Sequence, residues 1–146
     1  VADIATTTTT VSSLVHSKDD ILYVGYDNRL IKKDGAGAFA SALALPTNQV
    51  ITSICEYGNY LAIGCRSKYS GGKSIAYLWD RDSSLSTISE SYDWGEGVLQ
   101  VLEVVDGVLI GISSERTAGT SITNDRIVFR ALRRSDACFS GELSFP

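Results

Sequence analysis

Three segments of the sequence share one pattern: Ile21-Leu22-Tyr23-Val24-Gly25, Tyr60-Leu61-Ala62-Ile63-Gly64 and Gly107-Val108-Leu109-Ile110-Gly111. Each is a short apolar run that ends in glycine and follows a polar turn residue, Asp20, Asn59 or Asp106. The final glycines recur after 39 and then 47 residues. Short apolar runs rich in Val, Ile, Leu and Tyr and bounded by turn residues are typical of β-strands. Self-similarity at such a spacing indicates a repeat architecture.

Further strands are expected on both sides of each segment, so that each unit becomes a four-stranded meander. The expected first strands are 11–15, 50–55 and 98–104, the third strands 29–33, 74–79 and 126–132, and the fourth strands 38–45, 85–91 and 139–145. The segment 36–45 is rich in alanine and compatible with a helix, but the repeat assigns a strand to it.

The ends of the units give a second sign of repetition. Phe39, Leu43 and Pro46 recur 100 residues later; their counterparts are Phe139, Leu143 and Pro146. The predicted units are therefore 11–46, 47–97 and 98–146. Residues 1–10 form a Thr-rich alternating segment, which we expect to be the outer strand of a preceding unit. The chain contains no Met, which indicates a processed product or a piece of something larger.

Four-stranded antiparallel units that repeat every roughly 40 to 50 residues are typical of β-propellers. We therefore predict an all-β fold of three four-stranded antiparallel blades with an additional N-terminal strand from a preceding blade. Propellers carry about 4 to 8 blades, so three cannot close a ring. The expected partners are other protein subunits, other copies of the chain, or further blades of the same protein. An open arc of three blades and a β-sandwich of about twelve strands are the alternative folds.

One stretch carries a resemblance to a known family. Ser74-Ile75-Ala76-Tyr77-Leu78-Trp79-Asp80-Arg81-Asp82 resembles the end of the third strand of a WD repeat, with Trp79-Asp80 in the place of the dipeptide. The other units read Lys33-Asp34 and Ala131-Leu132 there. In its divergent blades and long loops the chain is similar to propellers of phage tail and other virion proteins. We therefore expect a non-catalytic scaffold or protein-interaction module that is a piece of a larger structural assembly, such as a phage virion or tail protein, and we expect no cofactor.

Composition excludes several classes of protein. The 146 residues are 44% hydrophobic and 21% charged, with a net charge of −4, which is typical of one soluble globular domain. The acidic balance argues against nucleic acid as a partner, and no apolar stretch is long enough to span a membrane. The three cysteines, Cys55, Cys65 and Cys138, lack the spacing of metal sites. We interpret them as small buried hydrophobic residues without a disulfide.

Two features resemble catalytic motifs and have simpler interpretations. Gly71-Gly72-Lys73-Ser74 ends like a phosphate-binding loop, but Ser67 stands where such a loop has its first glycine, and a strand is predicted to follow. A hairpin loop is the preferred interpretation. His16 is the only histidine and has Asp19 and Asp20 nearby, but its place at a strand end favours a surface residue.

Two charged segments are interpreted in the same way. Asp80-Arg81-Asp82 has carboxylates at alternate positions, as in calcium loops, but lacks the later ligands. We interpret it as a solvated turn and expect no metal site. The basic cluster comprises Arg126, Arg130, Arg133 and Arg134. Alternation with Ile127 and Phe129 predicts that Arg126 and Arg130 face solvent.

The segment 90–97, Glu-Ser-Tyr-Asp-Trp-Gly-Glu-Gly, concentrates three carboxylates and two aromatic rings. Glycoside chemistry uses acids together with rings on which a sugar rests. The alternative function is therefore a carbohydrate-binding or carbohydrate-cleaving propeller that uses the Glu90–Glu96 loop, with a glycan as partner. A turn with a packed tryptophan is the simpler interpretation, and we predict no catalytic residue.

The long loops provide the best guide to a binding surface. In an antiparallel meander, the loops expected at 66–73, 91–97 and 113–125 emerge at the same end of the sheets. Long loops on a rigid scaffold are where binding is usually found. We therefore predict an interaction surface on these loops, lined by Tyr69, Tyr92, Trp94 and Arg116.

Overall fold

The computed structural model describes residues 11–17, 19–82, 84, 87–116, 125–133 and 138–145. Within these ranges the regular elements are twelve β-strands, and no helix occurs among them. The strands are β1 (Val11–His16), β2 (Ile21–Tyr26), β3 (Arg29–Asp34), β4 (Ala40–Ala44), β5 (Gln49–Tyr57), β6 (Tyr60–Ser67), β7 (Lys73–Trp79), β8 (Glu90–Glu96), β9 (Val98–Val105), β10 (Val108–Arg116), β11 (Asp125–Arg133) and β12 (Cys138–Phe145).

The strands form three four-stranded antiparallel sheets, β1–β4, β5–β8 and β9–β12, each with sequential neighbours paired. We call them the first, second and third sheets. The all-β class and the four-stranded meander in each unit are thereby confirmed. The alanine-rich segment is a strand, as the repeat predicted, since β4 covers Ala40–Ala44. The strand predicted at 1–10 lies outside the described residues.

One predicted strand is misplaced. The fourth strand of the second unit was expected at 85–91, but β8 covers Glu90–Glu96 and pairs with β7 from Leu78↔Glu90 to Lys73↔Glu96. The reason is burial, because β8 places the rings of Tyr92 and Trp94 in the hydrophobic core. Two large aromatic side chains bury far more apolar surface than the leucine and isoleucine of the predicted segment.

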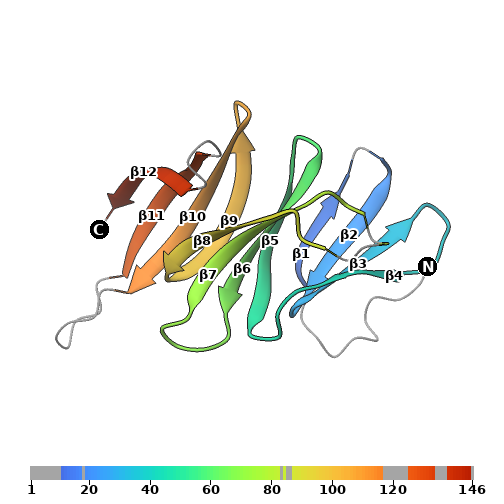
Figure 1. The fold of residues 1–146 in the computed structure, drawn as a ribbon, viewed down its shortest axis with the longest axis horizontal. Coiled ribbons are helices and arrows are strands. Elements are labelled where there is room, and N and C mark those ends of the chain that lie inside the picture. Colours follow the sequence, from blue (N-terminus) through green and yellow to red (C-terminus); the bar gives the residue numbers. More distant parts are fainter. Residues whose placement is uncertain are drawn as a thin grey trace.

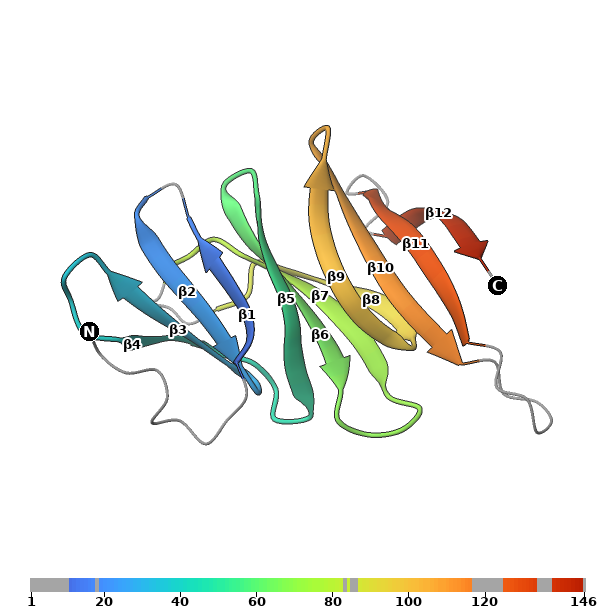
Figure 2. The same cartoon turned by 180° about the vertical axis from the view of Figure 1, so that it is seen from behind.

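The three sheets lie in a row along the long axis of the molecule, in chain order (Figures 1 and 2). The first strand of the second sheet, β5, contacts both other first strands, β1 and β9. The first and third sheets therefore lie at opposite ends, and the second sheet is covered on both faces. We call the side of a sheet that faces the preceding sheet its rear face, and the opposite side its front face.

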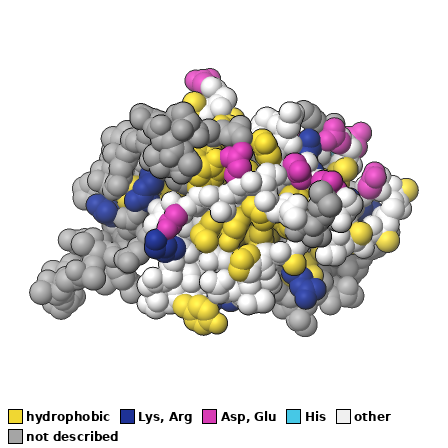
Figure 3. Space-filling model, in the orientation of Figure 1, with side chains coloured by type: hydrophobic (Ala, Val, Ile, Leu, Met, Phe, Trp, Pro, Cys, Tyr) yellow, Lys and Arg dark blue, Asp and Glu magenta, His cyan; other side chains and the backbone are white. Residues whose placement is uncertain are grey.

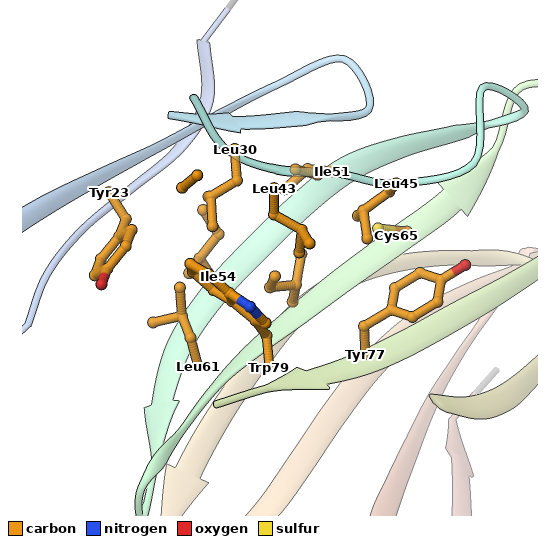
Figure 4. Close-up of a cluster of buried hydrophobic side chains, with 12 residues drawn as sticks. Tyr23, Leu30, Leu43, Leu45, Ile51, Ile54, Leu61, Cys65, Tyr77 and Trp79 are labelled. Atoms are coloured by element: carbon orange, nitrogen blue, oxygen red, sulfur yellow. The ribbon is translucent and has the colours of Figure 1, made fainter. Parts of the chain in front are cut away.

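Two hydrophobic clusters hold the row together. Figure 4 shows the first cluster, between the first and second sheets, where the rings of Tyr23 and Trp79 meet edge to face at a centroid distance of 5.9 Å. Its buried members are Tyr23, Leu30, Ala42, Leu43, Leu45, Ile51, Ile54, Leu61, Ile63, Cys65, Tyr77 and Trp79. The second cluster, between the second and third sheets, comprises Cys55, Ala62, Ala76, Leu78, Tyr92, Trp94, Leu99, Leu102, Leu109 and Leu132.

Two of the repeated glycines mark where one sheet approaches the next. A Cβ atom at Gly25 would lie 2.7 Å from Cγ2 of Ile51, and one at Gly64 would lie 3.1 Å from Cδ2 of Leu99. Both neighbours belong to the first strand of the following sheet. A side chain at either position would push the sheets apart, so glycine permits the close contact.

The third repeated glycine does not match the other two. Gly25 and Gly64 are the fifth residues of their strands, whereas Gly111 is the fourth residue of β10. Because a shift of one residue turns a side chain to the other face of a sheet, Gly111 lies on the rear face. A Cβ atom there would lie 2.0 Å from Cη2 of Trp94. The residue equivalent to Gly25 and Gly64 is Ile112, which like them immediately precedes the bulge in the first hairpin.

Candidate functional site

The four residues predicted to line a binding surface do not lie together on one surface. Tyr69 is 71% exposed at the β6–β7 hairpin, as expected. Tyr92 and Trp94 are only 5% and 2% exposed. The prediction that these two lie on an exposed loop is wrong, because their segment is strand β8. Arg116 is the last residue of β10, and its side chain lies outside the described residues.

Trp94 instead joins the second and third sheets. Its ring lies over Gly111, and the guanidinium of Arg130 lies 5.6 Å from the ring centroid. Arg130 also donates a hydrogen bond from Nη1 to the backbone carbonyl of Trp94, at 3.0 Å. A cation over an indole ring and a hydrogen bond to the same residue both favour the packed arrangement.

The predicted orientation of β11 is therefore reversed. Arg130 faces the second sheet rather than solvent, on the same face as the buried Val128 and Leu132. Ile127, which was expected inside, is 50% exposed. The cause is the period of two along a strand, since burial of Val128 and Leu132 turns their neighbours outward. Arg133 has no described side chain, and Arg134 lies outside the described residues.

The two carboxylates of the 90–97 segment whose side chains are described, those of Glu90 and Asp93, lie on opposite faces of the sheet. Glu90 accepts a hydrogen bond from the Tyr92 hydroxyl and pairs across the sheet with Leu78, on the front face. Asp93 pairs with Ile75, on the rear face, and forms an ion pair of 2.5 Å with Lys73. Glycosidases need two carboxyl groups that flank one bond. The described side chains do not provide this geometry, and the side chain of Glu96 lies outside them.

The environment of Asp93 is that of a surface ion pair. Partial burial acts to raise the pKa of its carboxyl group, but the hydrogen bond from Lys73, the backbone N–H of Gly95 and the charge of Lys73 together lower it below the ordinary value. The carboxylate is therefore held in its charged form, which suits a structural contact between β7 and β8 rather than proton transfer.

The other sequence motifs have the simpler structures that were predicted for them. Gly71 and Gly72 belong to the β6–β7 hairpin, and strand β7 begins at Lys73, where a phosphate-binding loop would lead into a helix. His16 is exposed at the end of β1. Arg81 of the predicted solvated turn forms an ion pair of 2.7 Å with Asp19. Among the described residues, no three His, Cys, Asp or Glu side chains gather closely enough to hold a metal ion.

The two cysteines with described side chains are buried and unpaired, as predicted. Burial, with a smaller contribution from the charge of Glu103, raises the pKa of the Cys55 thiol to about 12. Burial also raises the pKa of Cys65. Both thiols therefore remain protonated near neutral pH and act as packing groups. The side chain of Cys138 lies outside the described residues.

The sequence interpretation missed the most conspicuous apolar surface, the front face of the third sheet. Val101, Val105, Val108 and Ile127 are 41%, 49%, 41% and 50% exposed. Ile112 lies beside Val101 on the same face, because the two are paired across β9 and β10. In the sequence, the residues of this face that belong to β9 and β10 stand at every second position, which predicts that they share one face of the sheet. The pattern does not tell which face of the sheet is covered.

Charged side chains show no single gathering on the face drawn in Figure 3. Asp and Glu lie mostly in its upper half, and Lys and Arg are scattered. In the part of the chain that the structure describes, no helical segment meets the length and hydropathy needed to cross a bilayer.

No protein-family model matches the sequence, and no curated protein matches it. The sheets and their exposed face are therefore the basis for a functional proposal.

Proposed function

We propose that the chain is an arc of propeller-type blades that acts as a non-catalytic scaffold and protein-interaction module within a larger structural assembly, such as a phage virion or tail. The observation that supports this most directly is the succession of sheets, in which β5 lies between the first strands β1 and β9. In a β-propeller, four-stranded blades pack face to face around a centre and their first strands lie innermost.

The hydrogen bonds that β5 forms with the sheets on both sides favour a rigid role. The Thr52 hydroxyl donates a hydrogen bond of 2.5 Å to the carbonyl of Leu99, and the Ser53 hydroxyl accepts one of 2.9 Å from the backbone N–H of Leu102. Ile51 N–H donates to the carbonyl of Asp27, at 2.7 Å. Such bonds fix the position of one sheet on the next, in addition to the two hydrophobic clusters. A scaffold that presents surfaces benefits from this rigidity.

The exposed face of the third sheet supports a role within an assembly. Val101, Val105, Val108 and Ile127 lie on one sheet and are each at least 41% exposed. Monomeric proteins rarely leave large contiguous apolar areas in water, and such areas mark interaction sites. The chain therefore has a surface that favours contact with another protein body.

Sedimentation of native material tests this proposal. An extract of cells that produce the chain is separated on a density gradient without denaturant, and the chain is detected with an antibody. We expect it in the fast fractions that contain large particles, and to move to slow fractions when the particles are dissociated. Recovery of all the chain in the fractions of free proteins, under gentle conditions, would contradict a role in an assembly.

A further inference from the structure

The front face of the third sheet is mostly apolar. The cross-strand pairs of β9, β10 and β11 place eleven residues with described side chains on it, and nine of these are apolar. They are Val98, Val101, Glu103, Val105, Val108, Ile110, Ile112, Ser114, Ile127, Phe129 and Ala131. Glu103 is the only charged residue of the eleven. Arg116 and Asp125 pair at one end of the same face, and their side chains lie outside the described residues. A face of this kind matches the inside of a protein better than its surface.

This face continues a series of interfaces that the chain already contains. The front face of the first sheet is covered by the rear face of the second, and the front face of the second by the rear face of the third. In both cases a pair of apolar residues on the incoming first strand meets the preceding sheet, Ile51 with Ile54 and Leu99 with Leu102.

The first sheet has the same rear pattern and no preceding sheet in the described chain. The bulge in β1 falls at the same place in the hairpin as the bulge in β5. By register, Val11 and Leu14 of β1 are therefore equivalent to Ile51 and Ile54 of β5. Leu22, Tyr26 and Ile31 lie on the same rear face and are partly exposed, whereas Val24 in the middle of this face is 1% exposed. Among the described residues, no other sheet packs on the front of the third sheet or on the rear of the first.

We propose that the front face of the third sheet docks onto the rear face of the first sheet in a second copy of the chain, head to tail. This inference rests on the proposed scaffold function and names its partner. Two copies joined by two such contacts contain six sheets, which lies within the range of about 4 to 8 blades in closed propellers. Head-to-tail contacts generate closed rings when the rotation between copies permits it.

Charge on the two faces is complementary. Glu103 is the only charged residue among the described side chains on the front face of the third sheet, whereas Arg29 and Lys33 lie on the rear face of the first sheet, paired with Tyr26 and Leu22. A contact between two front faces would instead bring like charges together. Complementary charge favours the head-to-tail arrangement over the face-to-face one.

The contact between copies differs from the two contacts within the chain. Ile112 replaces the glycine at the positions of Gly25 and Gly64, and Val101 replaces the serine at the position of Ser53. The bulkier side chain holds the sheets further apart, and the hydroxyl that accepts a backbone N–H is missing. Association between copies is therefore reversible and depends on concentration, whereas the contacts within the chain are permanent.

Analytical ultracentrifugation of the purified chain tests the proposal. We expect the mass to rise from one to two chains with concentration. Ile127→Asp and Val108→Asp, which place a charge on the front face, should each raise the dissociation constant about 100-fold or more, because an uncompensated carboxylate would be buried. Tyr69→Asp, at an exposed hairpin outside the face, is the control and should leave the mass unchanged. Circular dichroism verifies that each variant is folded.

Mixing variants distinguishes the two arrangements of copies. Leu22→Asp or Ile31→Asp blocks the rear face, and neither a rear-blocked chain nor a front-blocked chain should associate alone. Together they should form a pair of chains and nothing larger, because one intact front face and one intact rear face remain. Self-association of a folded rear-blocked chain would overturn the head-to-tail arrangement. A wild-type chain that stays single at all concentrations, or grows without limit regardless of Ile127→Asp, would overturn the proposal.

These outcomes are separable from those of the scaffold test. A single-chain mass in the centrifuge together with co-sedimentation in native particles would reject the second copy as partner and keep the scaffold function. A defined pair in the centrifuge together with slow sedimentation in native extracts would reject the larger assembly.

Discussion

The two interfaces between sheets achieve the same close approach with different chemistry. The interface between the first and second sheets is an aliphatic and aromatic cluster around Trp79. The interface between the second and third sheets has an arginine over the ring of Trp94, a hydrogen bond from Thr52 to the carbonyl of Leu99, and one from the Leu102 N–H to Ser53. The first interface has a main-chain hydrogen bond, from the Ile51 N–H to the carbonyl of Asp27, and an ion pair between Arg81 and Asp19. Hydrogen bonds to a backbone fix one register. Both interfaces therefore fix the position of their sheets, the first through a main-chain donor and the second through side-chain hydroxyls.

The largest expected effects come from removing the tryptophan at the centre of each interface. Trp79→Ala and Trp94→Ala should each lower the free energy of unfolding by about 3–5 kcal/mol, because each leaves a large cavity among buried side chains. Chemical denaturation followed by circular dichroism measures both. A loss below about 1 kcal/mol for one variant would show that its interface is not a packed core.

Substituting alanine for Gly25 or Gly64 compares how closely the sheets approach each other at the two interfaces. Gly25→Ala should cost about 1–3 kcal/mol, because its Cβ would lie 2.7 Å from Ile51 Cγ2. Gly64→Ala should cost less, since its nearest neighbour, Leu99 Cδ2, lies at 3.1 Å and belongs to the end of a side chain. Thermal unfolding of the two variants side by side gives the order. The reverse order would mean that the second interface is the tighter one.

Removing the hydroxyl group of Ser53 or Thr52 tests how much their hydrogen bonds to β9 stabilise the second interface. Ser53→Ala leaves the buried N–H of Leu102 without its acceptor and should cost about 1–2 kcal/mol. Thr52→Val keeps the shape of the side chain but removes the donor to Leu99, and should cost about 1 kcal/mol. Denaturant titrations measure both losses. If neither variant differs from the wild type, the hydrogen bonds do not contribute to holding the third sheet.

The smallest effect belongs to the ion pair between Lys73 and Asp93. Asp93→Asn should change stability by no more than about 0.5 kcal/mol at neutral pH, because both side chains are largely exposed. The pKa of Asp93 is lowered in the folded chain, so its contribution is present above the ordinary value of 3.8 and is lost as the pH falls through the lower folded pKa.

A stability profile from neutral to acid pH therefore should show the wild type and Asp93→Asn converging at low pH. Lys73→Gln removes the partner and should give the same profile. Divergence of the two curves in acid would contradict the direction of the pKa shift.

Much of the fold was predictable because the repeat combines local signals. Short apolar runs and turn residues predicted the hairpins of all three units, and the repeat outweighed the helix-compatible alanines of 36–45. The error at β8 arose because Leu85 and Ile88, separated by Ser and Thr, resemble a strand as well as Tyr92 and Trp94 do. Only packing against the third sheet decides between them.

The candidate site was less predictable, because exposure is a property of the whole packing. Tyr92 and Trp94 have the residue types of a binding surface, and their burial depends on Gly111 and Arg130 in another unit. The third glycine shows the same limit. It keeps its distance from the turn residue Asp106, but the strand begins one residue later than in the other units, and so it faces the other way.

Coverage of the second sheet on both faces affects how the molecule opens. Either end sheet can detach and leave the other interface intact, but the amides of β5, β6 and β7 become accessible only when both clusters have come apart. We therefore expect hydrogen exchange with solvent to be slowest in these strands, so that the second sheet is the last of the three described sheets to lose its protection.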